Sequence, residues 1–313
     1  MSSSHRTPAA ATDSKSSRSF YVGFCLAGLG SVLFSAKAVV AKLTYQYGVD
    51  ALTVIGFRML LSLPFFLLIS LWQMHKVRKK EIPALTRRQV AELVLLGFIG
   101  YYLASLLDFI GLQYITAGLE RLILFLSPTF VLLLSTVYLK KEIFPRQWVA
   151  LALSYLGVAL VFFQDLSFSG SNVLLGSVCV LGSAISYAIY LIRSGELIQK
   201  IGSTRLVAYA MSISAVYTLA HFLFIQGWDG LVQPMPVYTL SVIHAILNTV
   251  LPTFMIMWAV ERVGASMSAQ LGLLGPVSVL FLASWFLHEP ITAVQLVGTA
   301  FVLAGAMVLS RRR

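Results

Sequence analysis

Charged residues are scarce in this chain. Of its 313 residues, 11% are Asp, Glu, Lys or Arg, whereas 58% are hydrophobic. A soluble domain needs roughly a quarter of its residues charged to cover its surface. The shortage argues against an ordinary soluble protein and predicts an all-α membrane protein whose outer surface is solvated largely by lipid.

Cysteine and histidine are also rare. The two cysteines, Cys25 and Cys179, lie within apolar runs, where we interpret them as small buried hydrophobic residues and not as a disulfide or metal pair. The five histidines are scattered, and the sequence contains neither an HExxH motif nor a nucleotide-binding P-loop. We therefore expect no metal, no cofactor and no catalytic residues, and do not expect an enzyme.

The net charge of +11 would suit a nucleic-acid partner, but the placement of the basic residues indicates otherwise. They gather in short stretches between apolar runs, most of all at 75–88, which is typical of cytoplasmic loops. The polar residues 1–19 predict a disordered cytosolic tail, and Arg311, Arg312 and Arg313 are interpreted as contacts to lipid headgroups. The expected partners are membrane lipids and a small molecule, not nucleic acid.

A membrane-spanning helix needs about 20 apolar residues. Ten runs qualify, at 20–43, 50–74, 89–112, 119–138, 147–164, 173–193, 204–226, 237–259, 265–286 and 291–310. With ten spans, most Lys and Arg residues fall on one side, and the opposite loops around Asp165 and Asp229 hold none. This asymmetry predicts ten transmembrane helices with both termini in the cytoplasm.

Shifting the chain by 148 residues superposes residues 115–142 on 263–289, with Pro128 over Pro276 in the middle of a predicted helix. The match predicts two five-helix repeats, 20–164 and 173–310. Because five crossings are an odd number, the second copy is inverted across the membrane, an architecture typical of carriers. Pro128 and Pro276 are candidate hinges, although proline kinks also serve static packing.

Several features recur in both repeats: a short turn of small residues before span four or nine, the proline, a Glu that closes the helix (Glu142 or Glu289), and a following Gln-x-x-(Gly/Ala)-x₆-Gly. Together they resemble the paired EamA domains of the drug/metabolite transporter superfamily, over nearly the whole membrane part. The resemblance implies ten spans, a central cavity between helices one to four of each half, export of small metabolites such as amino acids, and a bacterial inner membrane.

Charge inside a membrane is costly, so each charged residue there needs a partner or water. The first repeat places five such residues in its outer half: Lys37, Arg58, Asp108, Glu120 and Arg121. The arginines suit a carboxylate or phosphate, and Asp108 suits an ammonium group or a proton. In the alternative interpretation the five residues pair with one another as structural contacts, or Lys37 and Lys42 reach outward to lipid headgroups.

The second repeat offers neutral polar residues instead. Tyr187 and Tyr190 share a face of span six, His244 and Asn248 share a face of span eight, and Gln270 lies about one and a half turns into span nine. Such side chains suit a pocket for a small amphipathic molecule, but they also suit interhelical hydrogen bonds, the role we favour for His244. The candidate substrate-binding residues are Lys37, Arg58, Asp108, Tyr187, Tyr190, Asn248 and Gln270.

The sequence thus predicts a secondary transporter that exports a small polar or zwitterionic, amino-acid-like metabolite by alternating access. An exchanger of phosphorylated compounds is the alternative within transport, although Asp108 and Glu120 partly cancel the cations that would hold phosphate. A channel and a multi-pass membrane enzyme are alternatives from other classes. Small residues seven apart, Ala150 with Gly157 and Gly298 with Gly305, favour close helix contact, either within the fold or between the protomers of a homodimer.

Overall fold

The computed structural model describes residues 10–139, 144–169 and 172–310, and within these ranges the chain is helical, without strands. The first half comprises α1 (Ala10–Ser35), α2 (Lys37–Tyr45), α3 (Ala51–Arg78), α4 (Arg87–Leu96), η1 (Gly97–Leu103), α5 (Ala104–Leu112), α6 (Ala117–Leu124), α7 (Ser127–Leu139) and α8 (Pro145–Ser169). The second comprises α9 (Asn172–Ile201), α10 (Ser203–Gln226), η2 (Asp229–Leu231), α11 (Met235–Ala245), η3 (Ile246–Val250), α12 (Leu251–Leu271), α13 (Leu274–Leu287) and α14 (Ala293–Ser310).

Eight helical stretches are long and apolar enough to cross a membrane, and two shorter apolar helices follow them, at Leu274–Leu287 and Ala293–Leu309. The long stretches match the first eight predicted spans, and the shorter helices coincide with the last two. Helix α1 begins at Ala10, inside the predicted tail. Glu142 and the three terminal arginines lie outside the described residues.

Side-chain caps explain where several helices begin. The Asp50 carboxylate accepts a hydrogen bond from the Thr53 amide at the start of α3, and Thr86 with Gln89 forms a capping box at the start of α4. The Thr116 hydroxyl accepts from the Leu119 amide and starts α6. Each cap satisfies an amide that lacks a partner in the first helical turn.

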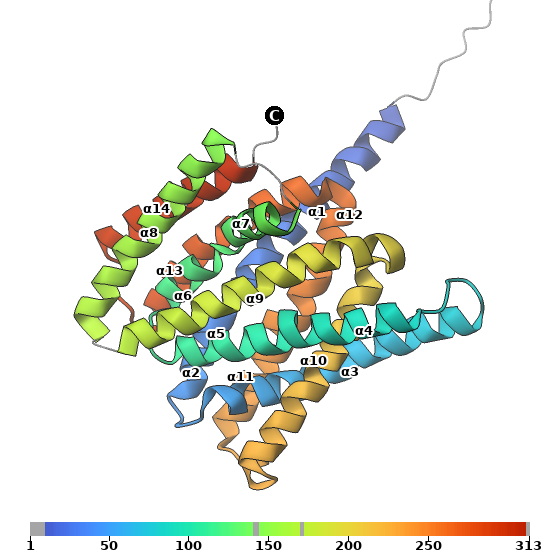
Figure 1. Ribbon diagram of the computed structural model, residues 1–313, viewed down its shortest axis with the longest axis horizontal. Coiled ribbons are helices and arrows are strands. Elements are labelled where there is room, and N and C mark those ends of the chain that lie inside the picture. The colour runs from blue at the N-terminus through green and yellow to red at the C-terminus, as the bar shows by residue number, and fades with distance from the viewer. Residues whose placement is uncertain (1–9, 140–143, 170–171, 311–313) are drawn as a thin grey trace, which may run out of the picture.

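Four helix pairs join the two halves along their length. Helix α1 packs on α12, α3 on α10, α5 on α9, and α8 on α14, and the α8–α14 pair lies along one edge of the bundle (Figure 1). Glycines permit close approach: a Cβ on Gly298 would lie 2.7 Å from the carbonyl oxygen of Gly157, and one on Gly176 would lie 2.8 Å from that of Gly111. The small residues of α8 and α14 therefore make their close contact within the fold.

Several predicted continuous spans are interrupted. Helix α6 ends at Leu124 and α7 begins at Ser127, so Pro128 starts a second segment and does not lie in the middle of one helix. Pro276 likewise lies at the start of α13, after a break at 272–273. The breaks fall at equivalent places in the two repeats, and the π-helical turns η1 and η3 do the same.

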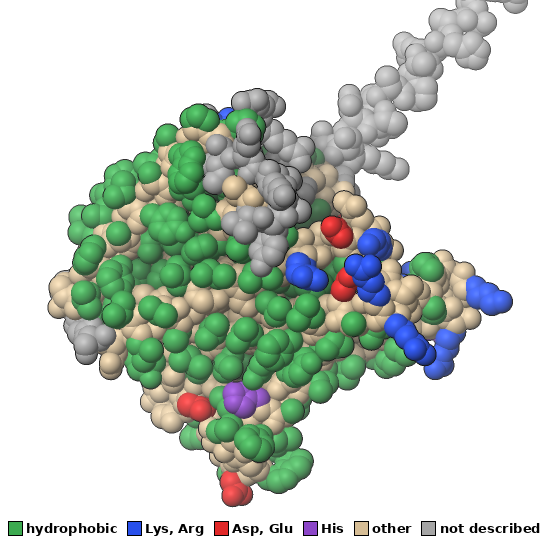
Figure 2. All heavy atoms as spheres, in the orientation of Figure 1, with side chains coloured by type: hydrophobic (Ala, Val, Ile, Leu, Met, Phe, Trp, Pro, Cys, Tyr) green, Lys and Arg blue, Asp and Glu red, His purple; other side chains and the backbone are tan. Residues whose placement is uncertain are grey.

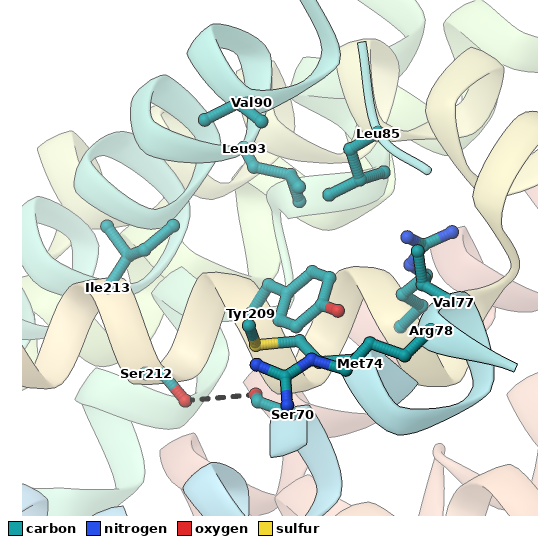
Figure 3. Close-up of a pocket in the computed structure, with 11 residues that line it drawn as sticks. Ser70, Met74, Val77, Arg78, Leu85, Val90, Leu93, Tyr209, Ser212 and Ile213 are labelled. Atoms are coloured by element: carbon teal, nitrogen blue, oxygen red, sulfur yellow. Dashed lines mark hydrogen bonds between the residues drawn. The ribbon is translucent and has the colours of Figure 1, made fainter. Parts of the chain in front are cut away.

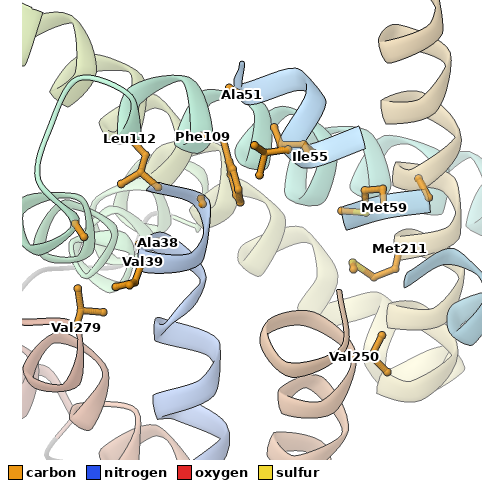
Figure 4. Close-up of a cluster of buried hydrophobic side chains, with 14 of the residues drawn as sticks. Ala38, Val39, Ala51, Ile55, Met59, Phe109, Leu112, Met211, Val250 and Val279 are labelled. Atoms are coloured by element: carbon orange, nitrogen blue, oxygen red, sulfur yellow. The ribbon is translucent and has the colours of Figure 1, made fainter. Parts of the chain in front are cut away.

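The largest buried apolar cluster joins elements from both halves (Figure 4). Val39, Ile55 and Phe109 contribute from the first half, and Met211 and Val279 from the second. In the space-filling view, apolar side chains cover the central face, whereas Lys and Arg gather at the end of the molecule that carries the α3–α4 connection (Figure 2). This distribution matches the charge asymmetry read from the sequence.

Candidate functional site

A buried ion cluster forms where α1 gives way to α2. The Lys37 ammonium lies 2.6 Å from Asp108 Oδ2 and 3.7 Å from Glu120 Oε1. The side chains of Asp108 and Glu120 are 3% and 0% exposed. Two carboxyl groups from α5 and α6 thus share one cation, so three of the five charged residues singled out from the sequence lie around one ammonium group.

Arg58 lies against the same part of α5. Its Nη2 donates to Ser105 Oγ at 3.0 Å, and its guanidinium carbon lies 4.9 Å from the centre of the Phe109 ring. Within the described ranges no carboxylate oxygen comes within 4.0 Å of Arg58. Arg58 is therefore held by a neutral hydrogen bond and a cation–π contact, not by an ion pair.

Hydrogen-bonding capacity is left unused in and around this cluster. Within the part of the chain that the structure describes, Asp108 Oδ1, both Glu120 oxygens and the Nε atoms of Arg58 and Arg121 are buried without a hydrogen-bond partner. Most buried polar atoms in folded proteins have one, and buried charges without partners are costly. The arrangement is suited to receive a proton or a polar ligand.

Residues of the second half close the cluster from the other side. The His244 ring stacks on Phe109 with centroids 5.4 Å apart, and neither of its nitrogens has a hydrogen-bond partner among the described residues. The favoured hydrogen-bonding role for His244 was therefore wrong. Asn248 donates from Nδ2 to the Leu33 carbonyl at 2.6 Å, while its Oδ1 stays unpartnered.

The predicted aromatic residues of α9 lie together. The Tyr187 and Tyr190 rings stack with centroids 5.6 Å apart, and the Tyr190 hydroxyl pairs with that of Tyr101 in η1 at 3.0 Å. Tyr190 is buried, whereas Tyr187 is 36% exposed and lies within electrostatic range of Arg121. Gln270 does not join them: its side chain is exposed and lines neither of the two cavities described below.

A second ion pair, missed by the sequence reasoning, lies where α13 ends. Lys42 Nζ is 2.9 Å from Glu289 Oε1 and also donates to the Ile115 carbonyl. Glu289 accepts in addition from the Ala117 amide at the start of α6, 3.1 Å away. Lys42 therefore does not reach outward to lipid headgroups. It links the two halves, and the acid of the second half balances the N-terminal dipole of a first-half helix.

One cavity, of about 410 Å³, lies between α3, α4 and α10 (Figure 3). Its polar side chains are largely occupied: the hydroxyls of Ser70 and Ser212 lie 3.3 Å apart, and Arg205 donates to the Pro83 carbonyl. No residue of the ion cluster lines it. The pocket is mostly apolar and offers little polar recognition.

A second cavity, of about 330 Å³, contains Arg121. Its lining comes from α1, α6 and α12 with their adjoining turns: Ser31, Phe34, Arg121, Phe125, Ile256, Val260, Ser268 and Gly272. It therefore lies between the two repeats, and Phe34 connects it to the ion cluster, because Lys37 Nζ lies 5.7 Å from the Phe34 ring centre.

Comparison with known proteins matches this chain to a transporter family and to proteins named as transporters. The EamA-like transporter family matches residues 21–163 and again 174–311. The chain is 28% identical over 292 residues to a Bacillus subtilis protein named uncharacterized transporter YcbK, covering 88% of this chain and 90% of that one. It is 32% identical over 177 residues to a Chlamydia muridarum protein named S-adenosylmethionine/S-adenosylhomocysteine transporter, covering 54% and 55%.

A crystal structure superposes with a TM-score of 0.55 at 14% identity, covering 93% of this chain and 96% of the other. At that identity the likeness concerns the fold alone, and it extends over almost the entire chain.

Proposed function

The chain belongs to the EamA-like transporter family, and we propose that it exports a small polar or zwitterionic, amino-acid-like metabolite across a bacterial inner membrane by alternating access. In this proposal ten helices span the membrane as two inverted repeats, with both termini in the cytoplasm. The last two helices are short, and span the bilayer with help from the turns that flank them.

Two observations support the inverted-repeat part of the proposal. The breaks before α7 and α13 fall at equivalent positions, and so do the π-helical turns η1 and η3. Interrupted helices near the midplane of the membrane, at the interface between repeats, are typical places for substrate sites in secondary transporters. π-helical turns within α-helices are likewise frequent at functional sites.

The observation that carries the substrate class is the cluster of Lys37, Asp108 and Glu120, in which Asp108 Oδ1 and both Glu120 oxygens accept no hydrogen bond from the described residues. Ionisable groups buried inside a membrane protein are expensive and usually mark a substrate or proton pathway. The cluster offers both acidic and basic groups, as a zwitterion requires. Two relatives are named S-adenosylmethionine/S-adenosylhomocysteine transporter. Both of those compounds carry an amino-acid group, so we include them among the substrates to be tested.

The test is counterflow uptake in proteoliposomes with amino acids, amines, purines, sugar phosphates, S-adenosylmethionine and S-adenosylhomocysteine. We expect saturable, trans-stimulated uptake of an amino-acid-like compound, lost in Asp108→Asn and reduced in Arg58→Ala. Arg88→Gln is the matched control, because it removes a cation whose side chain is 90% exposed in an ion pair on the surface.

Each other outcome contradicts a stated part of the proposal. Uptake of sugar phosphates alone would replace the zwitterion by a phosphorylated substrate. Flux that neither saturates nor trans-stimulates would indicate a channel. Full activity in Asp108→Asn and Arg58→Ala would make the cluster structural.

A further inference from the structure

The cavity beside Arg121 holds a buried cation that lacks an anion. Arg121 is 8% exposed, its Nε has no partner, and within the described parts of the chain its guanidinium makes no hydrogen bond and has no carboxylate oxygen within 4.0 Å. Glu120 and Asp108 act on Arg121 only at longer range. A buried guanidinium normally has a partner, because leaving a charge unpaired away from water costs several kcal/mol.

The surroundings of Arg121 are shaped to hold its guanidinium in place. The guanidinium carbon lies 5.7 Å from the Phe34 ring centre and 5.8 Å from that of Phe125. A Cβ on Gly275 would lie 2.7 Å from Arg121 Nη2 and 2.6 Å from Ser35 Oγ. The absence of a side chain at Gly275 therefore makes room for Arg121, whose planar donors remain available to a ligand.

The rest of the lining sets the character of that ligand. Ser31 and Ser268 add hydroxyl groups, whereas Phe34, Phe125, Ile256 and Val260 make the remainder apolar or aromatic. The volume of about 330 Å³ is at the lower end of the range for small-molecule pockets. A bidentate contact to Arg is the strongest available for a planar carboxylate.

We infer that this cavity is a binding site for the carboxylate end of a small molecule with an apolar or aromatic body. The inference rests on the proposed function, since it assigns one end of the zwitterion to Arg121. Phe34 is the neighbour shared with the ion cluster, because Lys37 Nζ lies 5.7 Å from the same ring. An ammonium group on the ligand would be attracted past Phe34 toward Glu120 and Asp108.

The test is equilibrium binding of radiolabelled 3-phenylpropionate to the purified full-length protein, with the neutral 3-phenylpropanamide as the matched probe. Wild type is expected to bind the carboxylate saturably and the amide at least about tenfold more weakly, since a hydrogen bond to a charged group is lost. Arg121→Gln is expected to weaken carboxylate binding at least about tenfold. Arg121→Lys is expected to fall between, because it keeps the charge but loses the bidentate geometry.

Val260→Trp tests the cavity itself while leaving Arg121 intact, and it carries the test if Arg121→Gln does not elute as a single species in gel filtration. It is expected to abolish binding by filling the space. Absence of saturable binding in wild type, equal binding of acid and amide, or unchanged binding in Arg121→Gln and Val260→Trp would overturn the inference.

Two further comparisons distinguish this site from a lipid contact, and a failure of the site from a failure of the carrier proposal. In nanodiscs, displacement of the probe by phosphatidylglycerol but not by phosphatidylcholine would assign Arg121 to a lipid headgroup and overturn the inference. A second outcome is that wild type binds 3-phenylpropionate but transports none of the compounds, with probe binding lost in Arg121→Gln. In that case the site stands and the carrier proposal fails. If transport proceeds and Arg121→Gln changes neither transport nor binding, the carrier stands and this site is rejected.

Discussion

The two halves of the molecule share their interruptions but not their charges. In both, a helix breaks just before a proline, at Pro128 and Pro276. Both also contain a π-helical turn earlier in the chain, η1 in the first half and η3 in the second. The first half buries Asp108, whereas the position equivalent by the 148-residue shift is Ile256 in the second. Backbone irregularity is therefore duplicated, whereas the described ion cluster of Lys37, Asp108 and Glu120 takes its charges from the first half alone.

This difference separates two roles. Duplicated breaks suit the movement of one repeat against the other that alternating access uses. A ligand that is itself asymmetric needs asymmetric contacts, so only one half has to supply charge. The experiments below test whether the buried charges, the helix crossings and the link between the halves separate in this way.

Removing the shared cation is expected to have the largest effect. In Lys37→Met, Asp108 and Glu120 would be left buried together without a counter-ion, at a cost of about 3–5 kcal/mol. Thermal unfolding in detergent should show a large loss, and Lys37→Met combined with Asp108→Asn should recover part of it. A double variant no more stable than Lys37→Met would show that the three residues do not act as one cluster.

The helix crossings come next. Gly298→Val would place a Cβ 2.5 Å from Val161 Cγ2 and 2.7 Å from the Gly157 carbonyl oxygen, separating α8 from α14 at about 1–3 kcal/mol. Gly176→Ala would separate α9 from α5, the helix that carries Asp108. We expect comparable losses of melting temperature but a larger loss of transport in Gly176→Ala. Equal transport losses would show that the contact of α5, which carries Asp108, is no more sensitive than the contact between α8 and α14.

The Lys42–Glu289 contact joins the two halves where α2 and the end of α13 meet. Glu289→Gln weakens the ion pair and the hydrogen bonds to the Ala117 amide, for about 1–2 kcal/mol. An Ala117→Cys reporter, with Cys25 and Cys179 replaced by Ser, should then react several-fold faster with an impermeant maleimide. Labelling at an unchanged rate would show that Glu289 does not hold this end closed.

Much of the fold could be predicted from apolar run length, because about 20 apolar residues are needed to cross a bilayer whatever their order. The meeting of Lys37, Asp108 and Glu120 was also predictable, since their depths along three spans agree. The sequence reasoning missed the break at Phe125 because it assumed that Pro128 bends one continuous helix. The π-helical turns have no local signature in the sequence.

Contacts between the halves were the hardest to predict. Lys42 and Glu289 are far apart in the chain, and the sequence does not give the relative rotation and shift of the helices that carry them. The lack of an ion-pair partner for Arg121 could not be predicted either, because it also depends on how the helices are rotated and shifted relative to one another. Glu120 beside it suggested a local partner, yet adjacent residues on a helix point in different directions.

The smallest expected effect concerns Asn248, whose equivalent in the first half is Gly100. Asn248→Ala removes one hydrogen bond to the Leu33 carbonyl and should cost about 1 kcal/mol. If the second half is chiefly framework, transport should fall only as far as the amount of folded protein falls, with KM unchanged. A KM raised severalfold at unaltered melting temperature would place Asn248 Oδ1, which accepts no hydrogen bond from the described residues, on the substrate. Recognition at the ion cluster would then include a polar atom of the second half, and the framework role of Asn248 would be disproved.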